Sequence, residues 1–194
     1  MNLSLQNLRV DGYLQSFCYF AEIMDEVRQE FTFQDHITVA ALNLLNDVHI
    51  NHNASVIVGV HARRGDILEK RWHDLGLRVP EKSYFVKAFR LLKSKCPGRN
   101  ITFIVVSDDM TWCRENLFRQ GVVCMPPASA AVHLAVLSMC DHVIINGGTY
   151  GWWAGWLAKG YVIYYTAYMA NGTYFGRLVN RRTYYPPQWI GLEN

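Results

Sequence analysis

The sequence predicts an α/β protein with a doubly wound parallel sheet. Short apolar runs rich in β-branched residues, at 56–61, 101–106 and 142–145, indicate strands that are buried on both faces. Segments of 10 to 15 residues with helical spacing separate these runs. Alternation of strands and helices at this spacing is typical of parallel sheets with helices on both faces.

The first half of the chain supplies two of these strands. Residues 33–46 carry apolar side chains at helical spacing, so we expect a helix there before the strand at 56–61. Residues 67–80 are mixed and charged, which predicts a long loop. A helix is expected over 83–95, because Ser83 suits an N-cap and Cys96-Pro97-Gly98 ends the pattern. The strand at 101–106 comes next.

The second half continues the alternation. Asp108 and Asp109 are expected to cap a helix that runs to about residue 118. Thr149 is expected to cap an apolar helix that runs to about residue 158. The remaining expected elements are a short strand at 122–124, a helix at 130–139, a strand at 142–145 and a final strand at 161–165.

Composition narrows the class of protein. A hydrophobic content of 51% over 194 residues excludes a disordered chain and suffices for one well-packed core. The net charge is only +3, with no long basic run, so nucleic acid is not an expected partner. No signal peptide and no run of membrane-spanning length is visible. The five cysteines have no C-x-x-C spacing, so no zinc site is expected.

Four N-glycosylation sequons begin at Asn2, Asn53, Asn100 and Asn171, where chance predicts roughly one. The excess favours a lumenal or extracellular protein. Because Asn100 opens a predicted strand, Asn53 and Asn171 are the expected sites of modification.

The first predicted strand runs directly into His61, Arg63, Arg64 and Asp66. Two adjacent guanidinium groups at the carboxyl end of a buried strand are costly unless an anion meets them. Open α/β sheets bind their ligands at this edge, and the planar fork of arginine suits phosphate. The alternative is that the arginines only pair with Asp66 or flank a turn.

Two further strand ends should meet the same edge. One is Ser107-Asp108-Asp109, where Asp108 could also be a plain N-cap. The other is the glycine turn at 146–151, whose backbone N–H groups and Thr149 hydroxyl suit an anion. Together they predict a cradle for a nucleoside diphosphate. Arginines and a helix dipole would neutralise its phosphates, so no metal is expected to be needed.

These residues also form three longer motifs. Residues 61–66 spell H-x-R-R-G-D, residues 104–117 contain the second motif, and residues 148–157 read GTYGWWAGWL. With these motifs in this order, the chain resembles the galactoside 2-α-L-fucosyltransferases of glycosyltransferase family 11. The flanks at 28–33 and 186–191 match as well, so the resemblance covers nearly the whole chain.

The resemblance implies transfer of L-fucose from GDP-β-L-fucose to the 2-hydroxyl of a terminal galactose, with inversion and without a required metal. It implies a GT-B-type enzyme of the Golgi lumen, with an N-terminal membrane anchor that this chain does not show. Residues 1–52 would be a remnant of the acceptor-side domain with a connecting helix. Residues 53–194 would form the Rossmann-like domain that binds GDP-fucose.

The resemblance also implies roles for individual residues. Arg63 and Arg64 would hold the diphosphate and stabilise departing GDP, and Asp66 is a candidate base for the acceptor hydroxyl. The implied catalytic residues are therefore Arg63, Arg64 and Asp66, and the implied donor-binding residues are His61, Arg63, Arg64, Asp108, Asp109, His133, Gly148 and Thr149.

Two departures from the family pattern leave alternatives open. Relatives usually have an aspartate where His133 stands, and a neutral imidazole cannot accept two hydrogen bonds from guanine as a carboxylate does. His133 could instead be a buried, locally bonded histidine. The first motif also starts only at His61, whereas relatives carry well over a hundred residues before it. A non-catalytic fragment or pseudoenzyme that binds GDP or glycan is therefore the alternative function.

Overall fold

The computed structural model describes residues 15–194, so the sequon at Asn2 lies outside the described residues. Six parallel strands form one sheet in the order β3-β2-β1-β4-β5-β6. This order confirms the doubly wound sheet, and it places the reversal of strand order between β1 and β4. The strands are β1 (Val56–Ala62), β2 (Ile101–Ser107), β3 (Val122–Cys124), β4 (His142–Ile145), β5 (Val162–Tyr165) and β6 (Ile190–Leu192).

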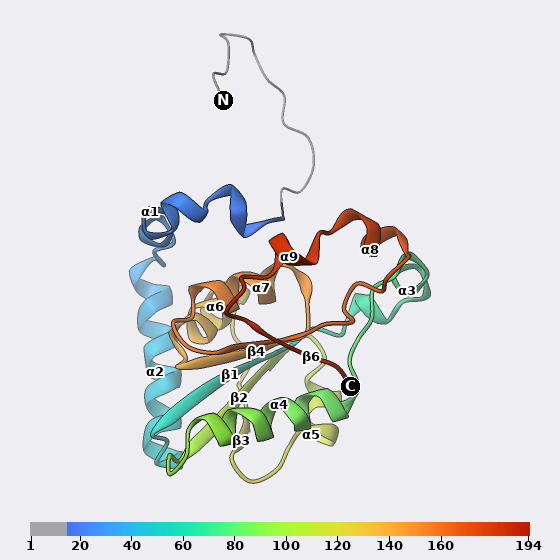
Figure 1. The fold of residues 1–194 in the computed structure, drawn as a ribbon. Coiled ribbons are helices and arrows are strands. Elements are labelled where there is room, and N and C mark those ends of the chain that lie inside the picture. The colour runs from blue at the N-terminus through green and yellow to red at the C-terminus, as the bar shows by residue number, and fades with distance from the viewer. Residues whose placement is uncertain (1–14) are drawn as a thin grey trace.

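The central strands are apolar because both faces of the sheet are covered. All seven residues of β1 are buried, and Val60 pairs with Val105 on one side and Ile144 on the other. Helices α4 (Lys82–Lys95) and α5 (Met110–Asn116) lie on one face, and α6 (Ala130–Met139) and α7 (Gly148–Leu157) lie on the opposite face (Figure 1). Helix α2 (Asp35–His52) packs beside α6.

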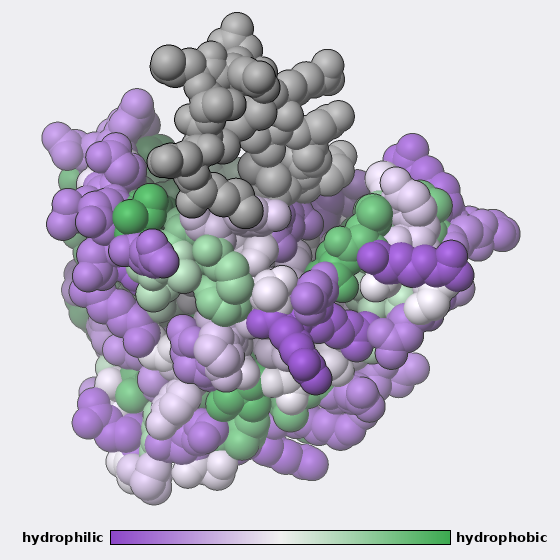
Figure 2. All heavy atoms as spheres, turned by 45° about the horizontal axis from the view of Figure 1, so that its top comes forward, coloured by the Kyte–Doolittle hydropathy of each residue, from purple (hydrophilic) through white to green (hydrophobic). Residues whose placement is uncertain are grey.

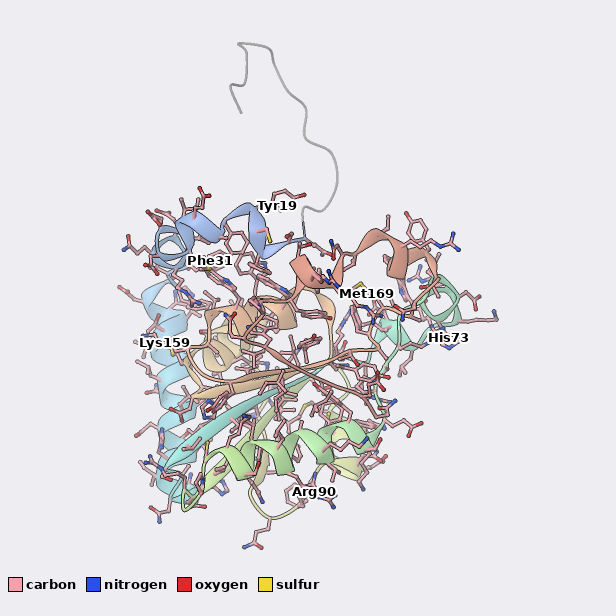
Figure 3. The ribbon with its side chains drawn as sticks, viewed as in Figure 1. Tyr19, Phe31, His73, Arg90, Lys159 and Met169 are labelled. Atoms are coloured by element: carbon pink, nitrogen blue, oxygen red, sulfur yellow. The ribbon has the colours of Figure 1, made fainter. Side chains whose placement is uncertain are left out.

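The N-terminal segment packs on α7. It consists of two short 3-10 helices, η1 (Phe17–Tyr19) and η2 (Ala21–Ile23), followed by α1 (Met24–Glu30). Phe31 stacks on Trp153 with 4.4 Å between ring centroids, and Arg28 lies 4.2 Å above the ring of Trp156. In Figure 3 Phe31 lies on this side of the sheet and Arg90 lies on the opposite face. Side chains of residues 16–31 therefore pack against α7, which covers one face of the sheet.

The outer surface of the described residues is mostly polar in the view of Figure 2, where hydrophilic side chains surround smaller hydrophobic areas. Scattered apolar side chains on a surface of this kind are normal for a globular protein. The apolar residues of the chain gather instead in one core around the sheet, which includes β1, β2 and β4.

Several element predictions need correction. The predicted loop at 67–80 holds η3 (Asp66–Leu68) and α3 (Lys70–Leu75), which is too short to show a helical hydrophobic period. Helix α2 runs six residues past its predicted end and stops at Asn53, which is left-handed at φ 46°. Helix α7 starts after Gly147, and Thr149 is not its cap.

The C-terminal region holds elements that the sequence did not predict. These are α8 (Tyr174–Leu178), α9 (Arg181–Tyr184) and the edge strand β6. Each is five residues or shorter, so periodicity provides no signal. Over residues 15–194, no helix combines the length and the apolar composition needed to cross a membrane.

Candidate active site

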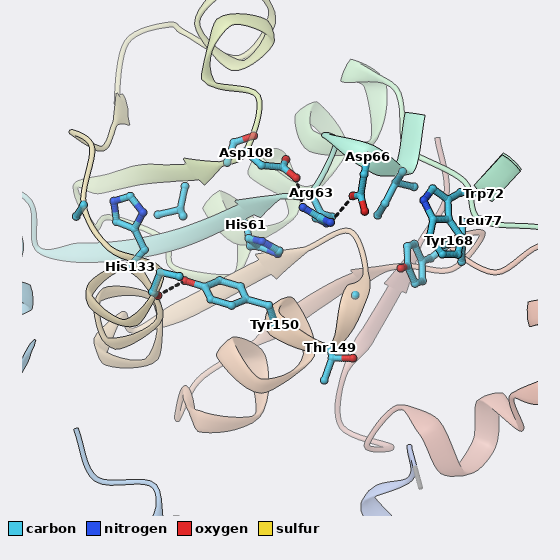
Figure 4. Close-up of a pocket in the computed structure, with 16 residues that line it drawn as sticks. His61, Arg63, Asp66, Trp72, Leu77, Asp108, His133, Thr149, Tyr150 and Tyr168 are labelled. Carbon is cyan, nitrogen blue, oxygen red and sulfur yellow. Dashed lines mark hydrogen bonds and ion pairs between the residues drawn. The ribbon is translucent and has the colours of Figure 1, made fainter. Parts of the chain in front are cut away.

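A cavity of about 560 Å³ opens at the carboxyl ends of β1, β2 and β4 (Figure 4). It lies where the strand order reverses, which is the position at which α/β sheets bind ligands. The predicted site residues that line it are His61, Arg63, Asp66, Asp108, His133, Gly148 and Thr149. The structure therefore brings the three predicted strand ends together around one space.

A buried amide fixes the chain where β1 ends. The Arg63 backbone N–H donates to Asn146 Oδ1 at 2.7 Å, and Asn146 Nδ2 donates back to the Arg63 carbonyl at 2.7 Å. Asn146, which comes directly after β4, is only 1% exposed. These paired bonds tie the ends of β1 and β4 to each other. The sequence signal for this role was an asparagine placed directly after a buried strand.

The guanidinium group of Arg63 lies between two carboxylates. It forms ion pairs with Asp66 and with Asp108, and its side chain is 34% exposed at the cavity. The expected alternative, a pairing of arginine with Asp66, is thus present in the structure. One cation and two carboxylates leave these three side chains with a net negative charge. An incoming phosphate must therefore displace a carboxylate from Arg63 and gain further donors.

Arg64 has different surroundings. Its guanidinium lies 3.7 Å above the ring of Trp112, and Arg64 Nε donates to Asp109 Oδ2 at 3.3 Å. The side chain is 12% exposed, and neither Arg64 nor Asp109 lines the cavity. In this geometry only the first arginine of the motif presents its charge to the cavity.

The two aspartates after β2 have separate roles. Asp109 caps α5 by accepting from the Trp112 backbone N–H at 3.0 Å. The interpretation of Asp108 as a plain N-cap is therefore wrong. Asp108 instead accepts from the Arg64 backbone N–H at 2.8 Å and pairs with the Arg63 side chain. A Cβ at Gly65 would lie 2.4 Å from Asp108 Oδ2, so this approach requires glycine.

The first turn of α7 forms the third side of the cavity. Gly147 has φ 147°, and a Cβ there would lie 2.1 Å from the ring of Tyr168. No side chain caps the helix, and both Gly148 and Thr149 line the cavity. The uncapped N–H groups and the positive end of the helix dipole make this turn suitable for an anion. Thr149 Oγ1 accepts from Gln15 Nε2 at 3.0 Å.

His61 is a neutral side chain in this site. Its pKa is lowered to about 4, mainly by burial; the charge of Asp108 opposes this shift and the charge of Arg63 adds to it. Its Nδ1 is buried without a partner among residues 15–194. A Cβ at Gly151 would lie 2.6 Å from this atom, so α7 can pack against His61 only with glycine there. A neutral imidazole offers one donor and one acceptor.

His133 lies at one end of the cavity. Its Nε2 is 3.0 Å from the Pro126 carbonyl oxygen, which can only accept, so the proton is assigned to Nε2 and Nδ1 is an acceptor. His133 is thus locally bonded, as the alternative expected, but it is half-buried and lines the cavity. Tyr150, whose hydroxyl donates to the Ala130 carbonyl at 2.7 Å, closes the same end.

Four lining residues that the sequence did not predict lie at the opposite end, namely Ile67, Trp72, Leu77 and Tyr168. Three of them fall in the segment predicted as a loop. Tyr168 lies three residues after β5, so the end of a further strand was the available signal. Among residues 15–194, no three His, Cys, Asp or Glu side chains form a group that could hold a metal ion.

A parallel sheet with an arginine and an uncapped helix start at its switch point is typical of the class of α/β proteins that bind phosphate-containing ligands. Within that class, this chain belongs to glycosyltransferase family 11. The model of this family, described as Glycosyl transferase family 11, matches residues 1–193. The resemblance drawn from the three motifs is thereby confirmed.

Individual relatives agree with the family match. The chain is 32% identical to galactoside alpha-(1,2)-fucosyltransferase 2 of Sus scrofa, over 96% of this chain and 56% of that protein. It is 30% identical to galactoside 2-alpha-L-fucosyltransferase SEC1 of Bos taurus, over 95% of this chain and 51% of that protein. The chain therefore spans about half the length of these relatives.

Among solved structures, the chain is similar to POFUT1 in complex with GDP, with a TM-score of 0.49 and 14% identity. That similarity covers 68% of this chain and 46% of POFUT1. At this level the match assigns no residue a role.

Proposed function

We propose that this chain transfers L-fucose from GDP-β-L-fucose to the 2-hydroxyl of a terminal galactose, with inversion. The observation that carries the proposal is the meeting of Arg63 and the first turn of α7 at one cavity. The family match and the names of the relatives support the same reaction. On this proposal, residues 53–194 bind the donor, and residues 1–52 are the remnant of an acceptor-side domain with its connecting helix.

The diphosphate would lie between Arg63 and the backbone N–H groups of Gly148 and Thr149. An arginine fork and a helix start are both good phosphate partners, and together they offset the negative charge that develops as GDP leaves. His61 would add one neutral hydrogen bond. As the resemblance to the family implies, the proposal includes no metal.

Asp66 is the proposed base. In the reaction the galactose O2 forms a bond to C1 of fucose while the bond from C1 to the GDP oxygen breaks, and the electron pair leaves with GDP. The proton of the acceptor hydroxyl would move to the Asp66 carboxylate, which lines the cavity beside Arg63. Once phosphate occupies Arg63, this carboxylate is released from its ion pair.

We also propose that the protein acts in the Golgi lumen and carries glycans at Asn53 and Asn171. Both residues are exposed. Asn100 is different, because its Nδ2 donates to the carbonyl oxygens of His52 at 3.1 Å and Asn53 at 2.7 Å. Attachment of a glycan at Asn100 would replace one of the two Nδ2 hydrogens and so remove at least one of those bonds.

A transfer assay tests the proposed function. The protein is incubated with radiolabelled GDP-fucose and either lactose or a lactose analogue that lacks the galactose 2-hydroxyl. We expect labelled trisaccharide from lactose only. Equal labelling of the analogue would refute the linkage, and binding of GDP-fucose without any transfer would favour the non-catalytic alternative.

A further inference from the structure

The cavity has two chemically different ends. His133 and Tyr150 lie at one end, and the mostly apolar side chains of Trp72, Leu77 and Tyr168 lie at the other (Figure 4). We call the second end the apolar corner, formed by Ile67, Trp72, Leu77 and Tyr168. Ile67, Leu77 and Tyr168 are 6%, 9% and 7% exposed although all three line the cavity. This corner suits an apolar part of a ligand.

The apolar corner is held by contacts between two distant segments. Leu77 forms an isolated antiparallel bridge with Met169. The Arg78 N–H donates to the Tyr168 carbonyl at 2.8 Å, and the Ala170 N–H donates to the Gly76 carbonyl at 2.8 Å. Backbone bonds on both sides of Leu77 therefore fix the backbone position from which its side chain reaches the cavity.

The position of Arg63 relates the corner to a bound donor. Arg63 lies between His133 and the apolar corner (Figure 4). In a nucleotide sugar the diphosphate separates the nucleoside from the sugar. With the diphosphate at Arg63 and the base at the His133 end, the sugar must extend toward Leu77 and Trp72. Asp66, the proposed base, stands beside the same end.

We propose that the apolar corner receives the methyl group on C5 of the fucosyl residue and makes the site selective for a 6-deoxy sugar. This inference rests on the proposed function. The methyl group is the most apolar part of fucose, and L-galactose differs from L-fucose only by a hydroxyl on that carbon. D-Arabinose in its pyranose form has the same ring without the carbon.

Simple magnitudes set the expected selectivity. Burying one methyl group favours binding by about fourfold, so GDP-fucose should bind about fourfold more tightly than GDP-D-arabinose. A hydroxyl forced against Ile67 and Leu77 would lose hydrogen bonds to water. An apolar pocket rejects such a hydroxyl by up to about 100-fold, which sets the expected range for GDP-L-galactose.

Calorimetric titration with GDP, GDP-fucose and GDP-D-arabinose tests the inference. In Leu77→Ala, we expect the preference for GDP-fucose over GDP-D-arabinose to disappear while the affinity for GDP is unchanged. Leu75→Ala is the matched control, since Leu75 is 37% exposed and does not line the cavity. The control should keep the full preference.

The outcomes separate this inference from the proposed function. If GDP and GDP-fucose bind but Leu77→Ala keeps the preference, the corner does not hold the methyl group and only the inference fails. If the unchanged protein binds neither ligand, the proposed function fails. Should Leu77→Ala lose GDP binding through misfolding, the smaller change Ile67→Val decides: a reduced preference supports the inference, and an unchanged preference overturns it.

Discussion

Replacing Arg63 is expected to reduce the affinity for GDP, whereas replacing the neighbouring Arg64 is expected to reduce the stability of the fold. Arg63 presents its charge to the cavity, and a charge-assisted hydrogen bond contributes about 1.5–3 kcal/mol. Arg63→Ala should therefore raise the dissociation constant of GDP by about 10- to 150-fold. The free energy of unfolding should fall by less than about 1 kcal/mol, because the Arg63 side chain is 34% exposed and ion pairs at such positions contribute little.

Arg64→Ala should show the reverse pattern. Its guanidinium is 12% exposed and stacks on Trp112, and a cation–π contact of this kind contributes about 0.5–2 kcal/mol. The variant also leaves Asp109 without its ion pair. We expect the free energy of unfolding to fall by about 1–2 kcal/mol, and the affinity for GDP to change by less than about threefold.

Calorimetry with GDP and urea unfolding measure both properties for both variants. Equal losses of GDP affinity would show that Arg64 also reaches the phosphates, as the sequence predicted. An unchanged affinity in Arg63→Ala would refute the assignment of the cavity as a diphosphate site.

Three further predictions concern His61, Gly147 and His133. The pKa of His61 is about 4 in the folded protein, whereas its ordinary value of 6.5 applies in the unfolded chain. As the pH falls, His61 is therefore protonated in the unfolded chain before it is protonated in the folded protein. Its contribution to stability is complete above pH 6.5 and is lost between pH 6.5 and 4; His61→Gln should therefore recover about 2–3 kcal/mol of the unfolding free energy lost between pH 7 and 4.5. Gly147→Ala should destabilise the fold by more than about 2 kcal/mol and abolish GDP binding, because the new methyl group meets Tyr168. His133→Asp should increase the preference for GDP over ADP, because a carboxylate accepts two hydrogen bonds from guanine.

A specific experimental result would contradict each of these three predictions. Identical pH-dependent losses in urea midpoint for His61→Gln and the unchanged protein would contradict the first. Gly98→Ala is the control for the second, since Gly98 also has a positive φ but open space around it. If both alanine variants were destabilised equally, the contact with Tyr168 could not be the cause of the effect at Gly147. Equal affinities for GDP and ADP in His133→Asp would contradict the third.

The strong sequence signals came from buried strands and from the polar residues at their carboxyl ends. The runs at 56–61, 101–106 and 142–145 are covered on both faces, so their apolar composition predicted the sheet and the edge at which the site lies. The polar residues after each run could be assigned to one site because parallel strands end at the same edge. The sequence alone therefore predicted that Arg63, Asp108 and Thr149 lie close together, and all three line the cavity.

The parts that the sequence did not predict depend on contacts between distant segments. Arg63 and Arg64 are adjacent in the chain, and contacts with Trp112 and Asp109 hold the second one away from the cavity. The apolar corner is formed by the pairing of Leu77 with Met169 across more than ninety residues. Short elements such as α3 leave no periodic pattern and take their shape from this packing.

Calorimetric comparison of GDP with GMP provides the most direct test that the cavity grips a diphosphate. Arg63 and the first turn of α7 offer donors for both phosphates, so GDP should bind at least about tenfold more tightly than GMP, which corresponds to about 1.4 kcal/mol. Equal dissociation constants for the two nucleotides would mean that the second phosphate gains nothing from these groups, and the account of the site would be wrong.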